Sequence, residues 1–442
     1  MKKLLFSVAI FSTLLANAQN YLITFAGTGA SAIVNSVKVE NLTANTSLTL
    51  SGSDILRLTG TVGISQAENE QLSGIKIYPN PMTENSLLEI YPPVSGDATI
   101  SVYEITGKPV FQIHSYLENF RQEFRLSGIK NGFYLINVKG NTYQSSGKLL
   151  CNGKSNGTIS IEKVNTIIQA VDEKISKKDN KRAQATVEMP YSNGDRIKFT
   201  GISGIYSTVI TDIPAQDKTV TFNFISCTDA DNNNHAVVQI GIQVWMAENL
   251  KTIKYNDGTA IPLVPDGAAW AALSTPGYCW YGNESANKAI YGALYNWYTV
   301  NTGKLCPTGW HMPTDAEWTT LENYLIGNGY NYDGTTTGNN IAKSLASTTG
   351  WTSSTNTGVV GNTDYPAKRN ATGFTGLPGG YRGHDGGFYG VGFAGFAVYW
   401  WSATELDGPS AWGRRLYLDI SFVIREPSRK KEGCSVRCLK DI

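Results

Sequence analysis

Tryptophan is spread unevenly along this chain of 442 residues, and its distribution limits how the chain can be divided into domains. All ten tryptophans lie between Trp245 and Trp412, and the first 226 residues contain none. A chain of this length has room for about three domains of roughly 150 residues each. We therefore predict a boundary near Cys227, with an aromatic domain over residues 227–442 and smaller domains of a different kind before it.

The part of the chain before Cys227 has the pattern of short β-strands. Stretches such as SVKVENL, ILRLTGTV, ATISVYEITG and GFYLINVKG alternate apolar and polar residues, with Gly, Asn and Ser between them. This period of two is typical of half-buried strands, and turn residues at short spacing favour an antiparallel sandwich. We expect an N-terminal β segment at 19–73, a β-sandwich at 74–151, and an immunoglobulin-like β module with a charged linker at 152–226.

The first twenty residues predict export. Lys2 and Lys3 precede the apolar run 4–15, and Ala16-Asn17-Ala18 supplies a cleavage site of small residues. The run is shorter than the ~20 residues that span a bilayer, so we interpret residues 1–18 as a signal peptide and not as an anchor. No later stretch is long and apolar enough to cross a membrane. The expected location is outside the cell, either secreted or attached to the outer surface.

The charge balance excludes one class of partner. Lys plus Arg number 37 and Asp plus Glu number 36, so the net charge of +1 gives no electrostatic footprint for nucleic acid. Charged residues make up only 17% of the chain, which also contains 45 glycines and 23 tyrosines. This composition suits an exported protein that contacts neutral ligands. We expect its partner to be a polysaccharide or a cell-surface protein.

Residues 305–318, LCPTGWHMPTDAEW, contain the side chains from which many active sites are built. Thr314 and Glu317 also fit a capping box, in which each side chain accepts a hydrogen bond from the backbone N–H of the other residue. An apolar helical face follows at i, i+3 and i+7, made of Trp318, Leu321 and Leu325. We therefore predict a helix start at Thr314 and no acid–base pair.

No motif in the chain requires a metal or a cofactor. The HExxH and GxxxxGK[ST] patterns are absent, and the four histidines are scattered. Asp229, Asp231 and Asn233 alternate like the start of a calcium loop. Such a loop would need glycine and glutamate where the chain has Asn234 and Ile240. Turn chemistry is the preferred explanation of this run, and calcium is the weaker alternative.

Cys306 allows two interpretations. It could act as a nucleophile with His311 as its base, or it could form a disulfide with one of the five other cysteines. The oxidising compartment favours a disulfide. Cys227 and Cys279 are a second candidate pair, although the sequence does not fix the connectivity of six cysteines. We expect His311 to be packed or half-buried, and its role is left open.

Short motifs in the first half resemble a known family. These are IYPNP (77–81), YEITGK (103–108), GFYLINV (132–138) and KL (148–149). They are similar to the type IX secretion sorting domain, or Por secretion tail, of Bacteroidetes, and the resemblance covers residues 74–151. In that family the domain ends the chain and is removed at the outer membrane, whereas nearly 300 residues follow it here. The resemblance implies a role in sorting, and a β-sandwich spacer is the alternative.

The aromatic half resembles a second family. Residues 305–318 and five other motifs occur in family order: YCWYGNE (278–284), YGALYNWYTV (291–300), TGFTGLPGGYRGHDGGFYG (372–390), VYWWSATE (398–405) and EGCSVRCLKD (432–441). The family is the Fibrobacter succinogenes major paralogous domain. The resemblance implies a fold similar to C-type lectins and formylglycine-generating enzymes. It also implies a disulfide between Cys306 and Cys438, because C-type-lectin-like domains join a cysteine beside the first helix to the last strand.

The expected architecture is therefore multidomain, with β-sandwich-type modules followed by an α+β C-type-lectin-like domain. Its candidate binding site is the segment 377–405, where glycines allow close backbone approach and aromatic faces suit stacking on sugar rings or peptide side chains. Strand alternation predicts that one of Trp400 and Trp401 faces outward, and we assign that position to Trp401. The candidate contacts are Tyr381, Arg382, His384, Asp385, Trp401 and Glu405. The tryptophans expected in the core are Trp245, Trp280, Trp297 and Trp318.

The predicted function is non-catalytic binding of a glycan or another surface polymer. One alternative is an enzyme that diverged from the formylglycine-generating group. That group uses a cysteine pair in the glycine-rich region, whereas residues 372–405 contain no cysteine here. The other alternative is a structural adhesin component that binds a protein. A reactive free thiol would favour the enzyme.

Overall fold

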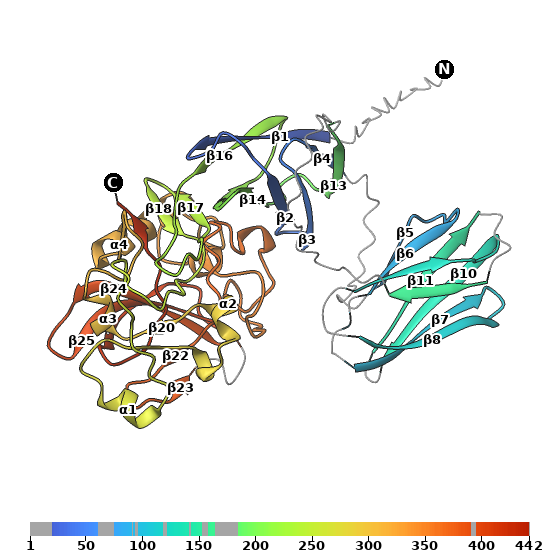
Figure 1. The fold of residues 1–442 in the computed structure, drawn as a ribbon. Coiled ribbons are helices and arrows are strands. Elements are labelled where there is room, and N and C mark those ends of the chain that lie inside the picture. Colours follow the sequence, from blue (N-terminus) through green and yellow to red (C-terminus); the bar gives the residue numbers. More distant parts are fainter. Residues whose placement is uncertain are drawn as a thin grey trace, which may run out of the picture. The chain divides into compact units, whose positions relative to one another are not determined.

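The computed structural model describes residues 20–60, 75–90, 92, 96–117, 122–140, 143–152, 158–163, 184–389 and 395–441 (Figure 1). Two compact units are present. The main unit comprises Met1–Val62 and Lys181–Ile442, and the inserted unit is Gly63–Asn180. The predicted signal peptide and the charged run 171–183 lie outside the described residues. Within the described ranges, no helix is long and apolar enough to cross a membrane.

The inserted unit is an antiparallel β-sandwich. Its two four-stranded sheets have the orders β11-β10-β7-β8 and β12-β9-β6-β5. The strands are β5 (Ile75–Tyr78), β6 (Asn85–Ile90), β7 (Gly96–Glu104), β8 (Pro109–Leu117), β9 (Gln122–Ser127), β10 (Gly132–Gly140), β11 (Gln144–Cys151) and β12 (Ser160–Lys163). Apolar residues from both sheets, among them Leu88, Ile100, Phe124 and Ile136, form one buried core. A β-sandwich is therefore present where one is predicted at 74–151, but it also includes β12, beyond the predicted end.

A second β-sandwich forms the first part of the main unit. One sheet has the order β13-β4-β1-β16, and the facing strands β15, β14, β2 and β3 belong to an eight-stranded sheet. The strands are β1 (Asn20–Gly29), β2 (Ser36–Asn41), β3 (Thr46–Ser51), β4 (Ile55–Gly60), β13 (Thr186–Tyr191), β14 (Ile197–Ser203), β15 (Tyr206–Asp212) and β16 (Lys218–Phe224). Ile23, Leu56, Phe199 and Phe222 lie in its shared core.

This sandwich joins two parts of the chain that the sequence analysis treats as separate. β1 pairs in parallel with β16, β13 pairs in parallel with β4, and β14 pairs antiparallel with β2. The strands before and after the inserted unit therefore share one core, which revises the division into a segment at 19–73 and a module at 152–226. Parallel pairing between distant strands leaves no turn motif in the sequence, so the pattern of single strands could not reveal it.

The C-terminal part of the main unit contains the rest of the eight-stranded sheet and a second, three-stranded sheet. The eight-stranded sheet continues from β15 to β17 (Val237–Ile240), β18 (Gln243–Met246), β27 (Leu439–Lys440) and β21 (Trp310–His311). The second sheet is β24 (Ala397–Glu405), β25 (Ser410–Tyr417) and β26 (Ile424–Arg429). This part of the main unit also contains two separate two-stranded sheets. One pairs β19 (Tyr278–Cys279) with β20 (Leu294–Tyr295), and the other pairs β22 (Tyr381–Arg382) with β23 (Phe388–Tyr389).

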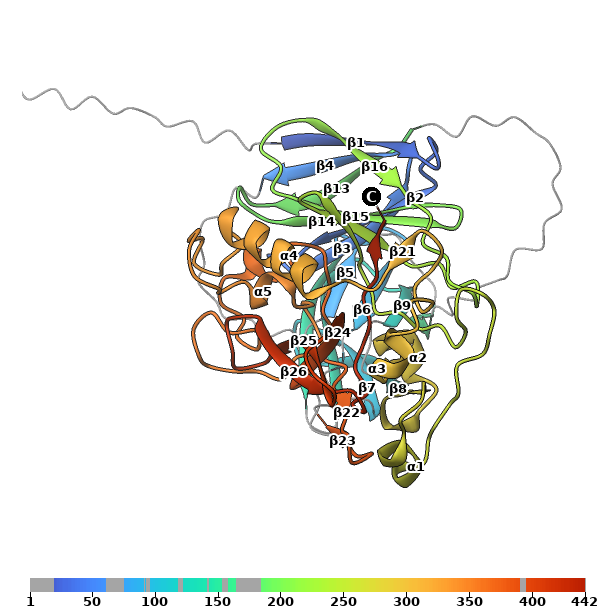
Figure 2. The ribbon, with the colours of Figure 1, turned by 90° about the vertical axis from the view of Figure 1, so that its left-hand side faces the viewer.

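The helices of the main unit are short apart from one. They are α1 (Gly267–Ala272), α2 (Asn287–Tyr291), α3 (Trp297–Val300), α4 (Asp315–Gly327) and α5 (Ala342–Leu345), with single 3₁₀ turns at Tyr281–Asn283 and Pro366–Lys368. Helices α3 and α4 contact β24 (Figure 2). Helix α4 begins with the predicted capping box: Thr314 Oγ1 accepts from the Glu317 N–H, and the Glu317 carboxylate accepts a 2.7 Å bond from the Thr314 N–H.

The two neighbouring tryptophans of β24 are buried on opposite faces of the strand. Trp400 is 1% exposed and packs against Trp318 and Phe374. Trp401 is 0% exposed and donates a hydrogen bond from its Nε1 to the Tyr295 carbonyl. The predicted outward position of Trp401 is therefore wrong, because core packs against both faces of β24 and not only one. The predicted burial is confirmed for Trp245, Trp280, Trp297 and Trp318.

Candidate binding surface

Four tyrosines form a continuous stack beside β24. We call this set, Tyr389, Tyr381, Tyr399 and Tyr417, the tyrosine ladder. The Tyr381 ring centroid lies 5.4 Å from that of Tyr389 and 4.1 Å from that of Tyr399, with interplanar angles of 27° and 30°. Tyr417 meets Tyr399 edge-on at 5.8 Å. Exposure falls from 44% at Tyr389 to 5% at Tyr399, so the ladder runs from the surface into the core.

Strand pairing places the four rings together. Tyr381 and Tyr389 are partners in the β22–β23 pair, and a bridge joins the residue before β22 to β24. In the β24–β25 pair, Tyr399 lies opposite Arg415, which is two residues before Tyr417. Side chains two residues apart on a strand point to the same face. Three different strand pairings are therefore needed to assemble the ladder.

Burial and hydrogen bonding keep the phenols of Tyr381 and Tyr399 neutral. Burial, and after it the nearby Glu432 carboxyl, raises the pKa of Tyr381 to about 12. Burial, together with a hydrogen bond between the two hydroxyls of Tyr399 and Tyr417, raises the pKa of Tyr399 well above its usual range. The Arg415 guanidinium lies 4.6 Å from the centroid of the Tyr399 ring. Neutral phenols can both donate and accept hydrogen bonds, and their rings offer a stacking surface.

Two buried polar atoms near the ladder have no hydrogen-bond partner among the described residues. These atoms are Oε2 of Glu432 and Nε of Arg415. Burial raises the pKa of Glu432, although the charge of Arg415 opposes this. Buried polar atoms are nearly always hydrogen-bonded, so an unpaired acceptor and an unpaired donor near one aromatic stack are unusual.

The turn between β22 and β23 adds exposed polar groups. His384 and Asp385 are exposed there. Asp385 Oδ2 accepts a 2.6 Å hydrogen bond from the Tyr389 hydroxyl, and Oδ1 accepts a 3.1 Å bond from the Gly387 N–H. The bond from Tyr389 lowers the pKa of Asp385 and raises the pKa of Tyr389. Three predicted contacts, Tyr381, His384 and Asp385, therefore lie on one surface with Tyr389.

Arg382 is a structural residue and not a ligand contact. It is 1% exposed. Its guanidinium donates to the carbonyls of Val264 at 2.6 Å, Pro265 at 2.9 Å and Gly386 at 3.0 Å. It also lies 4.5 Å from the ring centroid of Trp270 and 4.8 Å from that of Phe388. The prediction that Arg382 contacts a ligand is therefore wrong, because neighbouring backbone and rings enclose the charge.

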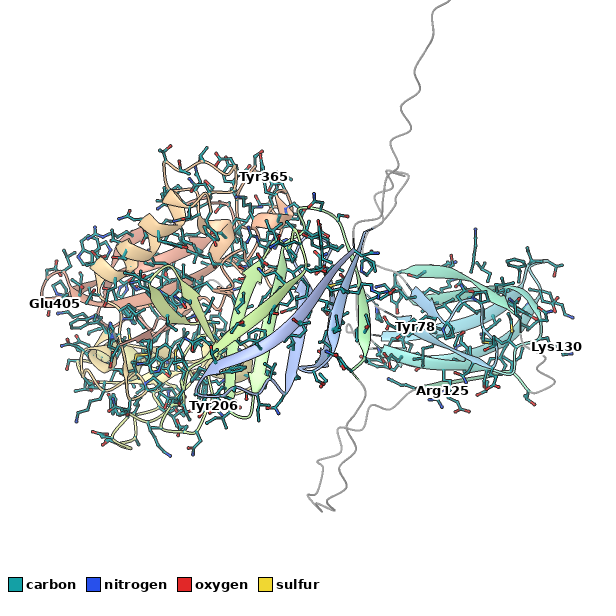
Figure 3. All side chains as sticks on the ribbon, turned by 90° about the horizontal axis from the view of Figure 1, so that it is seen from above. Tyr78, Arg125, Lys130, Tyr206, Tyr365 and Glu405 are labelled. Carbon is teal, nitrogen blue, oxygen red and sulfur yellow. A yellow bond between two sulfur atoms is a disulfide. The ribbon has the colours of Figure 1, made fainter. Side chains whose placement is uncertain are left out.

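Two other predicted contacts also lie away from this surface. Trp401 is buried, as described above. Glu405 is exposed at the surface of the main unit, at the end of β24 (Figure 3), where its Oε1 lies 2.5 Å from Lys430 Nζ. It follows Tyr399 by six residues, which is about 20 Å along a strand at ~3.3 Å per residue. The structure therefore does not bring Glu405 together with Tyr381 and Asp385.

Sequence reasoning missed three members of the ladder: Tyr389, Tyr399 and Tyr417. One signal was available, because the period of two in VYWW places Tyr399 on the same face of the strand as Trp401. The partners of that face come from β22 and β25, and no local pattern identifies them.

The cysteines form one disulfide. Cys306 and Cys438 are joined, as the resemblance implies, across a sequence separation of 132 residues. Cys227 and Cys279 are free and buried, so the second predicted pair is wrong. They pack into different hydrophobic clusters, which explains why they do not meet. Burial raises the pKa of the Cys279 thiol to about 12 and also raises those of Cys227 and Cys434.

His311 has a role that the sequence left open. Its Nδ1 lies 2.6 Å from Asp441 Oδ1, and its Nε2 lies 2.9 Å from Glu317 Oε1. Partial burial alone would lower the pKa of His311, but hydrogen bonds to the two carboxylates outweigh this effect and raise it. The imidazole therefore links the start of α4 to the residue after β27.

The run that resembles a calcium loop is a hydrogen-bonded turn. Asp229 Oδ1 accepts from the N–H groups of Asp231 at 3.0 Å and Asn233 at 2.9 Å, and Oδ2 lies 2.9 Å from His235 Nε2. The second nitrogen of His235 lies 2.8 Å from Glu248 Oε1. Among the residues that the structure describes, no group of three or more His, Cys, Asp or Glu side chains could hold a metal ion. Calcium binding stays an untested prediction.

Comparison with known proteins finds one family match in each unit. Residues 76–152 match the secretion system C-terminal sorting domain, which points to export and to a secreted or surface-attached protein. Residues 238–440 match the Fibrobacter succinogenes major domain. The chain thus has one region similar to each of these two families, and the region similar to the sorting domain lies between β4 and β13 in the sequence.

Other comparisons add little. No curated protein matches the chain significantly. In a crystal structure of dimeric latent PorU from Porphyromonas gingivalis, the similar region covers 24% of this chain and 11% of that one, at 17% identity and a TM-score of 0.16.

Proposed function

We propose that this secreted or surface protein is a non-catalytic binding protein that recognises a glycan or a related surface polymer through the tyrosine ladder. The observation that carries the proposal is a stack of rings that ends in exposed Tyr389, with Asp385 at its edge. Aromatic rings suit stacking on the apolar faces of sugars, and a few polar groups beside them fix the orientation of the ligand. His384, Asp385 and the neutral phenols would supply those polar groups.

The state of the cysteines supports binding over the alternative of a thiol-dependent enzyme. Reactive cysteines are partly exposed and have a lowered pKa. Here Cys306 and Cys438 form a disulfide, the other four cysteines are buried, and burial raises the pKa of three of those four thiols. Neither arrangement favours a nucleophile.

We also infer that the C-terminal domain has a C-type-lectin-like fold. Two features support this inference. The Cys306–Cys438 disulfide joins the segment before α4 to the segment before β27, and β27 pairs with β18 near the start of the domain. The strand pair brings the two ends of the domain together, and the disulfide ties the middle of the domain to its last segment.

The proposal is tested by screening the purified protein on glycan and polysaccharide arrays. Any glycan that binds is then titrated against Tyr389→Ala and Tyr381→Ala. We expect each variant to bind at least about fivefold more weakly, because stacking on one aromatic side chain is worth roughly 1–3 kcal/mol where nucleic-acid bases stack on proteins. The matched control is Tyr116→Ala, which removes another exposed tyrosine from the inserted unit.

Two results would contradict the proposal. One is the absence of binding to every glycan on the arrays. The other is binding that the two ladder variants leave as strong as the control does. In the second case another surface would hold the glycan.

A further inference from the structure

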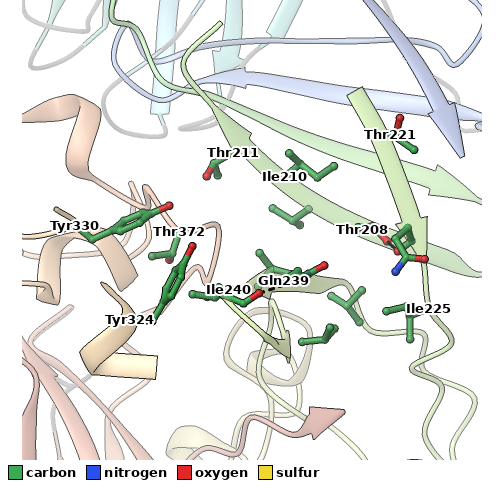
Figure 4. A pocket seen from close by; sticks show the side chains of 16 residues that line it. Thr208, Ile210, Thr211, Thr221, Ile225, Gln239, Ile240, Tyr324, Tyr330 and Thr372 are labelled. Carbon is green, nitrogen blue, oxygen red and sulfur yellow. Dashed lines mark hydrogen bonds between the residues drawn. The ribbon is translucent and has the colours of Figure 1, made fainter. Parts of the chain in front are cut away.

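The main unit contains a second candidate site, which is lined by strands other than those of the ladder. A pocket of about 320 Å³ opens where β15 and β17 meet, and we call it the seam pocket (Figure 4). Residues of β15, β16 and β17 line it, together with the rings of Tyr324 from α4 and Tyr330 from the loop after α4. Its volume falls within the roughly 300–1,000 Å³ of small-molecule sites.

The pocket exists because two parallel strands separate. Only two residue pairs join β15 to β17, Thr208 with Val237 and Val209 with Val238. The loop at Gly373 packs against the second of these pairs. Gly373 has φ +75°, and a Cβ at this position would lie 2.7 Å from Val209 Cγ1 and 3.4 Å from Val238 Cγ2. A glycine therefore lets this loop pack closely against both strands where their pairing ends.

The lining of the seam pocket is polar but uncharged. It contains threonine, asparagine, glutamine and tyrosine side chains together with valines and isoleucines, and no Asp, Glu, Lys, Arg or His. The hydroxyls of Tyr324 and Tyr330 form no hydrogen bond with any residue in the described ranges. Both rings lie beside Thr372 in the pocket wall (Figure 4). The lining thus offers two aromatic faces with their hydroxyls, whereas the hydroxyls of Thr208, Thr211 and Thr372 already donate to backbone carbonyls and can only accept further hydrogen bonds.

We propose that the seam pocket binds one neutral sugar unit. A charged ligand would lose its hydration without a counter-charge in the lining, and a purely apolar ligand would leave the tyrosine hydroxyls unpaired. A sugar ring has an apolar face for the tyrosine rings and hydroxyls for the polar side chains. The unit is either a free saccharide or the end of a longer chain. This site is independent of the ladder and does not depend on the function proposed for it.

The test uses matched pairs of ligands on the full protein. Glucose, galactose and mannose are each compared with their uronic acids by saturation-transfer NMR, because each pair differs by one carboxylate. We expect at least one neutral sugar to bind at millimolar concentration and its uronic acid to bind at least about tenfold more weakly. A soluble polysaccharide that ends in the same sugar distinguishes a free saccharide from a chain end as the natural ligand. If the polysaccharide binds more tightly than the free sugar, the ligand is the end of a chain.

Variants of the lining test whether the sugar binds in the seam pocket. Gln239→Trp fills the pocket from an exposed position, and Tyr330→Ala removes one ring. Both should lose at least about tenfold in affinity, and Gln239→Trp should keep the melting temperature of the unmodified protein. Tyr116→Ala, in the inserted unit, should leave the affinity unchanged. The proposal is overturned if no neutral sugar binds, if sugars and uronic acids bind equally, or if neither Gln239→Trp nor Tyr330→Ala weakens binding more than Tyr116→Ala does.

Discussion

His311 connects two parts of the C-terminal domain through its two ring nitrogens. The raised pKa of this histidine means that the folded state binds the proton more tightly than the unfolded state does. Its contribution to stability is therefore complete below the unfolded pKa of ~6.5 and is lost as pH rises through the folded pKa. Hydrogen bonds from Thr314 and His311 outweigh partial burial and lower the pKa of Glu317, so its contribution disappears instead as pH falls below ~4.3.

We predict that His311→Gln destabilises the protein more at pH 6 than at pH 9. The imidazolium bonds to Glu317 and Asp441 exist mainly at the lower pH, and glutamine cannot carry their charge. Urea denaturation at both pH values measures the difference. His114→Gln in the inserted unit is the control and should show the same small effect at both. A loss of stability at pH 9 as large as that at pH 6 would rule out the ionic link.

Arg382 gives a second prediction for a single residue. Arg382→Met should lower the free energy of unfolding by about 3 kcal/mol, because three carbonyls lose a charged donor in a buried place. The exposed Arg429→Met is the matched control and should change stability by less than about 0.5 kcal/mol. Chemical denaturation measures both. If Arg382→Met proves as stable as Arg429→Met, Arg382 has no structural role and is again a candidate ligand contact.

Among the helices and strands, α4 shows how local chemistry fixes an element. Thr314→Ala removes the hydroxyl that accepts from the Glu317 N–H, and we predict a loss of about 1 kcal/mol in the free energy of unfolding. Thr320→Ala, an exposed position inside the same helix, is the control and should be nearly neutral. Thermal and urea denaturation distinguish the two. Equal effects would mean that the cap does not set the stability of α4.

The sequence could predict elements whose causes are local. The capping box and the face of Trp318, Leu321 and Leu325 follow from spacing alone, and the structure contains both. The tyrosine ladder could not be predicted in this way, because its rings come from β22, β23, β24 and β25. Trp401 shows the same limit. Strand alternation places Trp401 and Trp400 on opposite faces, as the sequence predicts, but the sequence does not show that both faces of β24 are covered.

At the scale of the whole molecule, the disulfide closes the largest part of the C-terminal domain. The variant Cys306→Ala/Cys438→Ala should lose about 4–5 kcal/mol if constraint of the unfolded chain dominates, since the loop spans 132 residues. Denaturation with and without a reducing agent measures this. Reduction should destabilise the unmodified protein and leave the double variant unchanged. A response to reductant in the double variant would show that another cysteine pair had formed.

The position of the inserted unit leads to a prediction about the main unit. Replacing residues 63–180 with about ten Gly and Ser residues should leave the main unit folded. Because β4 and β13 are parallel, the linker must run back from the end of β4 to the start of β13, a distance of roughly 17 Å. A flexible chain of about ten residues spans this distance on average. The melting temperature and circular dichroism of the variant should match the corresponding transition of the full chain. Failure to fold would show that the main unit needs the inserted unit.

The interleaved strands on either side of the inserted unit also affect how the protein can be processed. A single proteolytic cut near the sorting domain would release no fragment of the folded protein, because residues 20–60 would stay paired with β13, β14 and β16. Two cuts would release the sorting domain and leave a nicked molecule, in which a short peptide is retained by hydrogen bonds and a shared core alone. The mature protein would then migrate as two chains under denaturing conditions and as one particle under native conditions.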